Sequence, residues 1–254
     1  MTLYESIPRR RSFTSFIQEP LEASVIDGLV DFLSDSVPPV DDIDWNFDTL
    51  PYVDMVRIAD REPGVKAPHY LVLRAERKEG CLQNCGYLGE RAVLYLTSLG
   101  IATRWQGSIT VGEDFPDTLP YVTAIAFGRS SEPFRSEEDL QLLVRLPMKK
   151  LCFGQYQPFQ SMIEAARLAP SAYNRQPCVY VGDNQGKLHV YRKKALLNHP
   201  IVSALSCIDT GVALAHLQIA AEAEGKQYAI TRLYAKPAFK SYIYQFTLGE
   251  AAAN

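Results

Sequence analysis

The feature that most constrains the fold is a pair of glycine-bracketed helical patterns that recur at one spacing. Gly86 and Gly100 bracket the first pattern, and Gly211 and Gly225 bracket the second, 125 residues later at both ends. Glycine just after a helix favours a left-handed C-terminal cap. The pattern predicts two diverged copies of one α/β unit joined head to tail. Two unrelated helix-strand units within one α/β domain would also produce it.

The order of the other predicted elements follows the same repeat. A helix, a strand, a glycine-started helix and a strand closed by glycine occur twice along the chain. A capping box at Ser161 predicts the start of a short helix that ends at Pro170. Residues 40–65 read as irregular with short strand pieces, and residues 129–141 as a charged connection. The predicted helices are 21–33, 84–99, 161–169 and 209–224, and the predicted strands are 69–75, 122–127, 178–181, 187–191 and 242–248.

Charge and cysteine usage narrow the partners and the compartment. The 254-residue chain has a net charge of −3, and its one concentrated basic run is Arg9–Arg11, so small molecules fit better than nucleic acid. Its five cysteines are odd in number and scattered, which is typical of a reduced cytoplasmic protein. The four histidines are also scattered, so we expect no metal site. No uninterrupted apolar run is long enough to span a bilayer, so we expect neither a signal peptide nor a membrane span.

Two motifs could bind a ligand. Arg10, Arg11 and Ser12 offer guanidinium forks and a hydroxyl within a few residues, which suits a phosphate group, although a solvated basic segment is the alternative. In the segment 170–177, Ser171 and Asn174 present donors and acceptors between two prolines. Such a loop can contact the polar edge of a planar heterocycle, or it can be an ordinary helix-to-strand turn.

Further candidates are weaker, and several common motifs are absent. Lys149 and Lys150 could add positive charge for an anion, and Gly107 after Gln106 would let backbone N–H groups approach a ligand closely. A surface lysine pair and a packed turn are the alternatives. The sequence has no G-x-G-x-x-G and no G-x-S-x-G motif, and no carboxylate pair stands out for acid-base work. We therefore predict no catalytic side chain.

Two segments resemble the FMN-dependent nitroreductase-like family. Arg10-Arg11-Ser12 is similar to the family's R-R-S opening, and the segment from Ala165 to Pro177 is similar to its helix followed by P-S-x-x-N-x-Q-P-W. The resemblance implies an α+β nitroreductase-like fold. Here it would be built as two repeats, each a β-sheet flanked by helices, related by an internal pseudo-twofold axis.

The two halves divide the family's motifs between them, which resembles the duplicated single-chain subgroup. Residues 1–154 would form the first half and residues 155–254 the second, in one compact unit. The resemblance implies one FMN at their interface and a monomeric pseudo-dimer, because each half lacks what the other keeps. The first half would supply Arg10, Arg11, Ser12, Gln106, Gly107, Lys149 and Lys150, and the second Pro170, Ser171 and Asn174.

The function that the resemblance implies is electron transfer from NAD(P)H through FMN to a small nitroaromatic or quinone acceptor. The flavin supplies this chemistry, so the lack of acid-base side chains is no objection. Two positions depart from the family pattern: Thr14 stands where the family has a further basic residue, and Cys178 replaces an aromatic one. A flavin-binding or regulatory protein without turnover is therefore the alternative. An interaction protein that uses residues 9–11 on an acidic partner is a third possibility.

Overall fold

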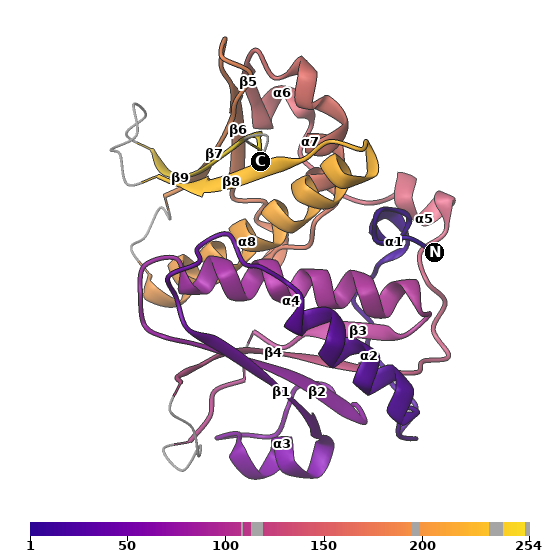
Figure 1. Cartoon of the computed structure of the whole chain (residues 1–254). Helices are drawn as coiled ribbons and strands as arrows, with labels where there is room; N and C mark the ends of the chain where they lie inside the picture. The colour runs from indigo at the N-terminus through magenta and orange to yellow at the C-terminus, as the bar shows by residue number, and fades with distance from the viewer. Residues whose placement is uncertain (108, 113–118, 195–198, 234–240, 252–254) are drawn as a thin grey trace. The chain divides into compact units, whose positions relative to one another are not determined.

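The computed structural model divides the chain into two compact units. Unit 1 comprises residues Met1–Val37, Asp42–Cys81 and Leu88–Leu142, and unit 2 comprises Pro38–Asp41, Leu82–Tyr87 and Leu143–Asn254. The structure describes residues 1–107, 109–112, 119–194, 199–233 and 241–251. Figure 1 shows the elements of both units by label.

Unit 1 is an antiparallel four-stranded sheet with helices. Its strand order is β1-β2-β4-β3, and every neighbouring pair is antiparallel. The strands are β1 (Trp45–Pro51), β2 (His69–Ala75), β3 (Ala102–Trp105) and β4 (Tyr121–Gly128), and the helices are α1 (Leu3–Arg9), α2 (Ala23–Ser34), α3 (Tyr52–Ile58), α5 (Glu137–Gln141) and most of α4 (Cys81–Ser98).

Strands β2 and β4 form the centre of unit 1 because they are apolar on both faces. On one face Tyr70 and Val72 belong to a buried cluster that includes Phe13 and Met55. On the other face α4 lies close at Gly89, where an added Cβ would be 2.4 Å from the Trp105 ring. The continuous apolar runs in the sequence are those of strands covered on both sides.

Unit 2 is a five-stranded sheet in the order β5-β6-β7-β9-β8. Strand β5 is parallel to β6, and the remaining pairs are antiparallel. The strands are β5 (Cys152–Gly154), β6 (Cys178–Gly182), β7 (Leu188–Lys193), β8 (Tyr228–Arg232) and β9 (Tyr242–Glu250), and the helices are α6 (Met148–Leu151), η1 (Gln157–Phe159), α7 (Gln160–Arg167), η2 (Ala172–Asn174) and α8 (Pro200–Ala223).

The two sheets share one strand order. Read along the chain, β1-β2-β4-β3 in unit 1 has the same pattern as β6-β7-β9-β8 in unit 2, with β5 as an addition. In both units the second strand is followed by the long helix, α4 or α8, and then by the remaining two strands. This order agrees with the sequence repeat, although the internal duplication itself stays a prediction.

Within unit 2 the first turns of α4 cross α8 at two glycines. An added Cβ at Gly211 would lie 1.9 Å from the Gln83 carbonyl oxygen, and one at Gly86 would lie 2.1 Å from the Ile208 carbonyl oxygen. Gln83 precedes Gly86 by three residues, and Ile208 precedes Gly211 by three, so the contact is reciprocal. Only glycine permits this backbone approach. Two of the glycines that marked the repeat in the sequence therefore lie at this crossing: Gly86 of α4 contacts α8, and Gly211 of α8 contacts α4.

Several local predictions are confirmed, and others are wrong. Gly100 and Gly225 adopt left-handed φ values of +76° and +69° directly after their helices, as predicted. The prediction of a capping box at Ser161 is wrong. Helix α7 begins at Gln160 with Phe159 as its N-cap, because the 3-10 turn η1 leads directly into it. The Ser161 hydroxyl instead donates to Glu224.

Two segments are more regular than the sequence predicts. Residues 40–65 contain β1 and α3, and the charged connection at 129–141 ends in α5. Helix α8 begins at Pro200, before the predicted start at 209, and by length and composition it could cross a membrane. The most apolar 18-residue stretch of α8 is 61% buried within the protein, as in a helix that packs in a protein core.

Candidate functional site

The predicted site residues fall into one group in each unit. Unit 1 holds Arg10, Arg11, Ser12, Gln106 and Gly107, and unit 2 holds Lys149, Lys150, Pro170, Ser171 and Asn174.

In unit 1 the arginine segment lies beside β3. Ser12 forms a parallel bridge with Thr103, and the Phe13 amide donates to the Thr103 carbonyl at 3.2 Å. The Arg104 guanidinium donates to the Phe13 carbonyl oxygen at 3.1 Å. Because β3 leads directly into Gln106 and Gly107, the structure brings the five predicted residues of this unit into one region.

Arg10 is buried beside an acidic residue that the sequence analysis did not single out. Its side chain is 4% exposed, and its Nε lies 3.8 Å from Oε1 of the fully buried Glu90. Glu90 also accepts a 3.0 Å hydrogen bond from Trp105 Nε1. Burial lowers the pKa of Arg10, and the Glu90 carboxylate partly offsets this. The pair fixes the guanidinium at the end of β3.

Two buried donors in this region have no hydrogen-bond partner among the described residues, and the Glu90 carboxylate, 3.8 Å from Arg10 Nε, is too far for such a bond. The two donors are Nε of Arg10 and Nε2 of Gln106, which is also buried. A buried donor without an acceptor is unfavourable by about 1–3 kcal/mol, so such groups point to a missing partner. Phosphate oxygens and ring carbonyls are acceptors of the required kind.

Arg11 contacts an acidic residue of the same unit, and its contact with a phosphate stays a prediction. Its guanidinium bonds Glu132 at 3.3 Å and the Pro133 carbonyl at 3.0 Å. The same Glu132 carboxylate accepts from the backbone amides and hydroxyls of Thr14 and Ser15 at 2.7–2.9 Å. These hydrogen bonds lower the pKa of Glu132 to about 2. Thr14, one of the departures from the family pattern, thus helps to hold an internal carboxylate.

A third arginine adds positive charge to the region. Arg135 is buried, its amide donates to the Arg9 carbonyl, and its guanidinium donates to the Pro8 carbonyl. Burial, together with the charges of Arg10 and Arg11, lowers the pKa of Arg135 to about 10. Neither Glu132 nor Arg135 carried a sequence signal, because only the fold brings them to residues 8–15.

In unit 2 residues 170–177, here called the polar loop, connect α7 to β6. Its backbone has positive φ at Tyr173 (53°), Asn174 (54°) and Gln176 (48°), all unusual for residues other than glycine. One hydrogen bond ties it to α8 and another closes it internally: the Ala172 backbone N–H donates to Asp209 Oδ1 at 2.9 Å, and the Gln176 backbone N–H donates to Ser171 Oγ at 3.0 Å.

Residues 144–146 hold the side chains of the polar loop. In the Asn174 side chain, Nδ2 donates to the Val144 carbonyl oxygen at 3.0 Å, and Oδ1 accepts a hydrogen bond from the Arg145 guanidinium at 2.9 Å. The Leu146 amide donates to Gln176 Oε1 at 2.7 Å. Arg145 also donates to two carbonyls at the end of α7. Asn174 and Ser171 thus support the loop itself, and their contact with a ligand stays a prediction.

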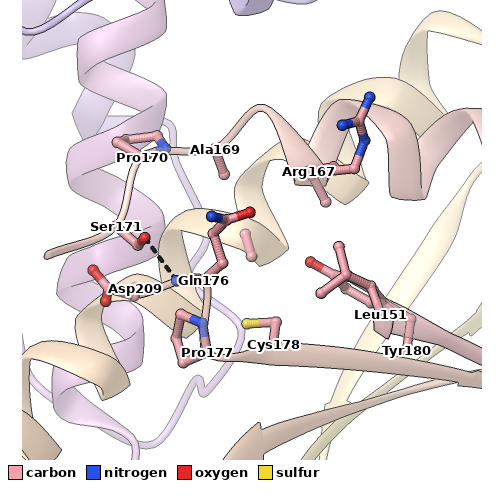
Figure 2. A pocket seen from close by; sticks show the side chains of 12 residues that line it. Leu151, Arg167, Ala169, Pro170, Ser171, Gln176, Pro177, Cys178, Tyr180 and Asp209 are labelled. Carbon is pink, nitrogen blue, oxygen red and sulfur yellow. Dashed lines mark hydrogen bonds between the residues drawn. The ribbon is translucent and has the colours of Figure 1, made fainter. Parts of the chain in front are cut away.

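A pocket lies beneath the polar loop, and Figure 2 shows the side chains around it. Asp209 on α8 lines it and is 7% exposed; its Oδ2 is buried without a partner among the described residues. Burial raises the pKa of Asp209 to about 7. Burial also raises the pKa of Cys178 to about 12, so its thiol is not a nucleophile. The pocket lining is Leu151, Ala166, Arg167, Ala169, Pro170, Ser171, Gln176, Pro177, Cys178, Tyr180, Asp209 and Ala213.

The lysine pair lies on the short helix α6, and both side chains are exposed. Neither is brought to the polar loop by a described hydrogen bond. No group of three or more His, Cys, Asp or Glu side chains suited to a metal ion occurs in the described part of the chain.

Comparison with known proteins places this fold. The chain is similar to a "putative nitroreductase" from Thermotoga maritima MSB8 (22% identity, TM-score 0.67), over 98% of this chain and 93% of that one. A nitroreductase family protein from Clostridium difficile 630 matches at 15% identity and TM-score 0.47, over 59% of this chain and 96% of that one. A nitroreductase with bound FMN from Bacteroides fragilis NCTC 9343 matches at 19% identity and TM-score 0.41, over 51% of this chain and 88% of that one.

No curated protein matches the sequence. The Thermotoga structure, at 22% identity, establishes the α+β nitroreductase-like fold, with sheets flanked by helices. A model of the family described as "Putative TM nitroreductase" matches residues 2–221. Since this match spans most of the 254 residues, the chain belongs to that nitroreductase family and is in general terms an oxidoreductase.

Proposed function

We propose that the chain binds FMN and transfers electrons from NAD(P)H to a small oxidised acceptor of the nitroaromatic or quinone type. The observation that carries the proposal is the pair of buried donors without a hydrogen-bond partner, Arg10 Nε and Gln106 Nε2, with the charges of Arg11 and Arg135 near Arg10. FMN offers phosphate oxygens and ring carbonyls to such donors. When bound, the flavin would supply the redox chemistry, and the protein would supply binding and orientation.

The chain's own groups would act by binding and by exclusion of water. Arg10, held by Glu90, would give a fixed positive charge for the phosphate, with Arg11 and Ser12 nearby. Gln106 would donate to an acceptor atom beside the close backbone approach that Gly107 permits. In unit 2, Pro170, Ser171 and Asn174 of the polar loop, with Lys149 and Lys150, complete the predicted set. That both groups serve one flavin in a monomeric cytoplasmic protein stays part of the proposal.

Gln106→Met gives the sharpest test of the unit 1 group. The side chain is similar in size, and Nε2 makes no hydrogen bond among the described residues, so stability should be unchanged or higher. Loss of one buried donor to the ligand should weaken FMN binding by about tenfold. Flavin fluorescence titration would measure this, with the exposed Arg57→Ala on α3 as a control. Wild-type protein without bound flavin, or unchanged affinity in Gln106→Met, would refute the proposal.

Stoichiometry and turnover test the remaining parts. We expect one FMN per chain, and weaker binding when either Gln106 in unit 1 or Ser171 in unit 2 is replaced. Anaerobic mixing with NADH or NADPH should bleach the flavin absorbance. Stable flavin absorbance under both donors would instead favour a binding or regulatory protein without turnover, the alternative suggested by Thr14 and Cys178.

A further inference from the structure

Tyr173 is a bulky side chain that is neither buried nor hydrogen-bonded among the described residues. It lies at the tip of the polar loop with a left-handed φ of 53°, and its side chain is 83% exposed. Its hydroxyl has no described hydrogen-bond partner. Glycine or asparagine would adopt this backbone conformation more readily than tyrosine. Neither burial nor hydrogen bonding within unit 2 explains the choice of residue.

The conformation at Tyr173 is imposed by its neighbours. On one side the Ala172 amide is tied to Asp209, and on the other the Asn174 amide donates to the Ser171 carbonyl at 2.9 Å. The Asn174 side chain is tied to Val144 and Arg145. Strain that the surrounding structure holds in place is a feature of ligand-contact segments. The loop therefore presents the Tyr173 ring on a fixed backbone.

Three other polar side chains of the loop bond within the protein, whereas the Arg175 side chain is exposed. Ser171, Asn174 and Gln176 all bond within the loop or to residues 144–146. Val144, whose carbonyl holds Asn174, is itself 74% exposed, so a second apolar side chain is presented beside the loop. The exposed side chains here therefore include the electron-rich ring of Tyr173, the aliphatic Val144 and the charged Arg175.

We propose that Tyr173 stacks on a flat, electron-poor aromatic ring bound at the polar loop. The inference rests on the proposed function, which gives two sources for such a ring: the flavin itself or the electron acceptor. An electron-rich phenol face and an electron-poor ring have complementary quadrupoles, and aromatic pairs favour offset stacking. From the usual strength of such pairs we expect a loss of about 3- to 10-fold in ring affinity when the phenol ring is removed.

The test compares Tyr173→Asn with Tyr173→Phe. Asparagine tolerates the left-handed conformation and removes the ring, whereas phenylalanine keeps it. We measure the Kd of each variant for FMN and for 3,5-dinitrobenzoate by titration calorimetry, and Tm by calorimetry. Tyr4→Asn, on the exposed side of α1, is the matched control. Tyr173→Asn should have a Tm equal to or about 2–4 °C above wild type, because strain is relieved, and should bind more weakly.

The two probes separate the sources of the ring. A raised Kd for FMN in Tyr173→Asn assigns the stacking to the flavin, and a raised Kd for dinitrobenzoate alone assigns it to the acceptor. Tyr173→Phe should match wild type in both. Absence of FMN binding by wild type would defeat the proposed function, while the dinitrobenzoate titration would still decide the role of Tyr173.

Four results would overturn the inference. The first three are equal affinities of Tyr173→Asn and wild type for both probes, no binding of either probe by wild type, and a lower Tm in Tyr173→Asn that accounts for weaker binding. A change in molecular mass on gel filtration without a change in ring affinity would also overturn it, since it would assign Tyr173 to a protein contact.

Discussion

Replacement of Asp209 by asparagine should change the stability of the protein in a pH-dependent way. The asparagine Oδ1 can still accept the Ala172 amide, so the support of the polar loop is kept. The substitution removes only the ability of a buried carboxyl to ionise. We expect Asp209→Asn to be more stable than wild type at pH 8 and close to wild type at pH 4.

The size of the effect follows from the pKa of Asp209. Burial raises it from 3.8 to about 7, against the opposing hydrogen bond from Ala172 and the charge of Arg175. A raised pKa in the folded state adds stability that is complete below pH 3.8 and is lost as pH rises through 7. Three pKa units correspond to about 4 kcal/mol, and local relaxation reduces this to about 2 kcal/mol. Cys178, which also lies near Asp209, stays protonated throughout this range.

Urea denaturation at pH 4, 6 and 8, followed by circular dichroism, measures the difference. Asp183→Asn is a control of opposite sign. Burial acts to raise the pKa of Asp183, but hydrogen bonds from Lys187, His189 and Gln185 outweigh it, and the pKa is lowered. That variant should lose stability at pH 8.

The reasoning would be refuted if Asp209→Asn were less stable than wild type at pH 8. A difference in free energy of unfolding that did not vary with pH would refute it equally, because it would show that the Asp209 carboxyl does not titrate between pH 4 and 8.

Three further predictions concern stability. Glu132→Gln should lose about 1–2 kcal/mol at pH 7 after allowance for solvent screening, and the deficit should shrink as pH falls from 4.5 towards 2, where wild type protonates its lowered carboxyl; urea midpoints along this range would show it. Gly211→Ala should lose about 2–4 kcal/mol, because the new Cβ would overlap the Gln83 carbonyl, whereas Gly64→Ala, with open space around it, should melt like wild type. Arg145→Lys should make the polar loop more sensitive to limited proteolysis, since one ammonium cannot replace three bonds of a guanidinium fork; equal cleavage rates would contradict this.

Local signals in the sequence predicted much of the fold. The apolar runs at 69–75 and 122–127 gave β2 and β4 nearly at their bounds, because a strand covered on both faces needs a continuous apolar run. Gly100 and Gly225 ended the two long helices as predicted. Helix α3 was missed because it follows β1 without a polar capping residue, with Pro51 as its N-cap.

The site was less predictable because its contacts are long-range. The motif named Arg11 as a phosphate ligand, and this stays a prediction; the partner that the structure gives Arg11 is Glu132, 121 residues along the chain. The Asn174 side chain is held by residues 29 and 30 positions earlier. A motif specifies which side chains are present, and only the fold determines whether each faces a ligand or the protein.

The reciprocal glycine crossing also bears on how the protein is made. Residues 82–87 belong to unit 2, yet they leave the ribosome long before α8, the helix they cross. Because α8, β8 and β9 come last, residues 82–87 lack their unit 2 partners during synthesis until nearly the whole chain has emerged. No single cut yields both units intact, and a fragment that starts at Leu143 would leave the glycine surface of α8 without its cover. The segments of the two units alternate along the sequence, so we expect neither half expressed alone to contain all the residues of a complete unit.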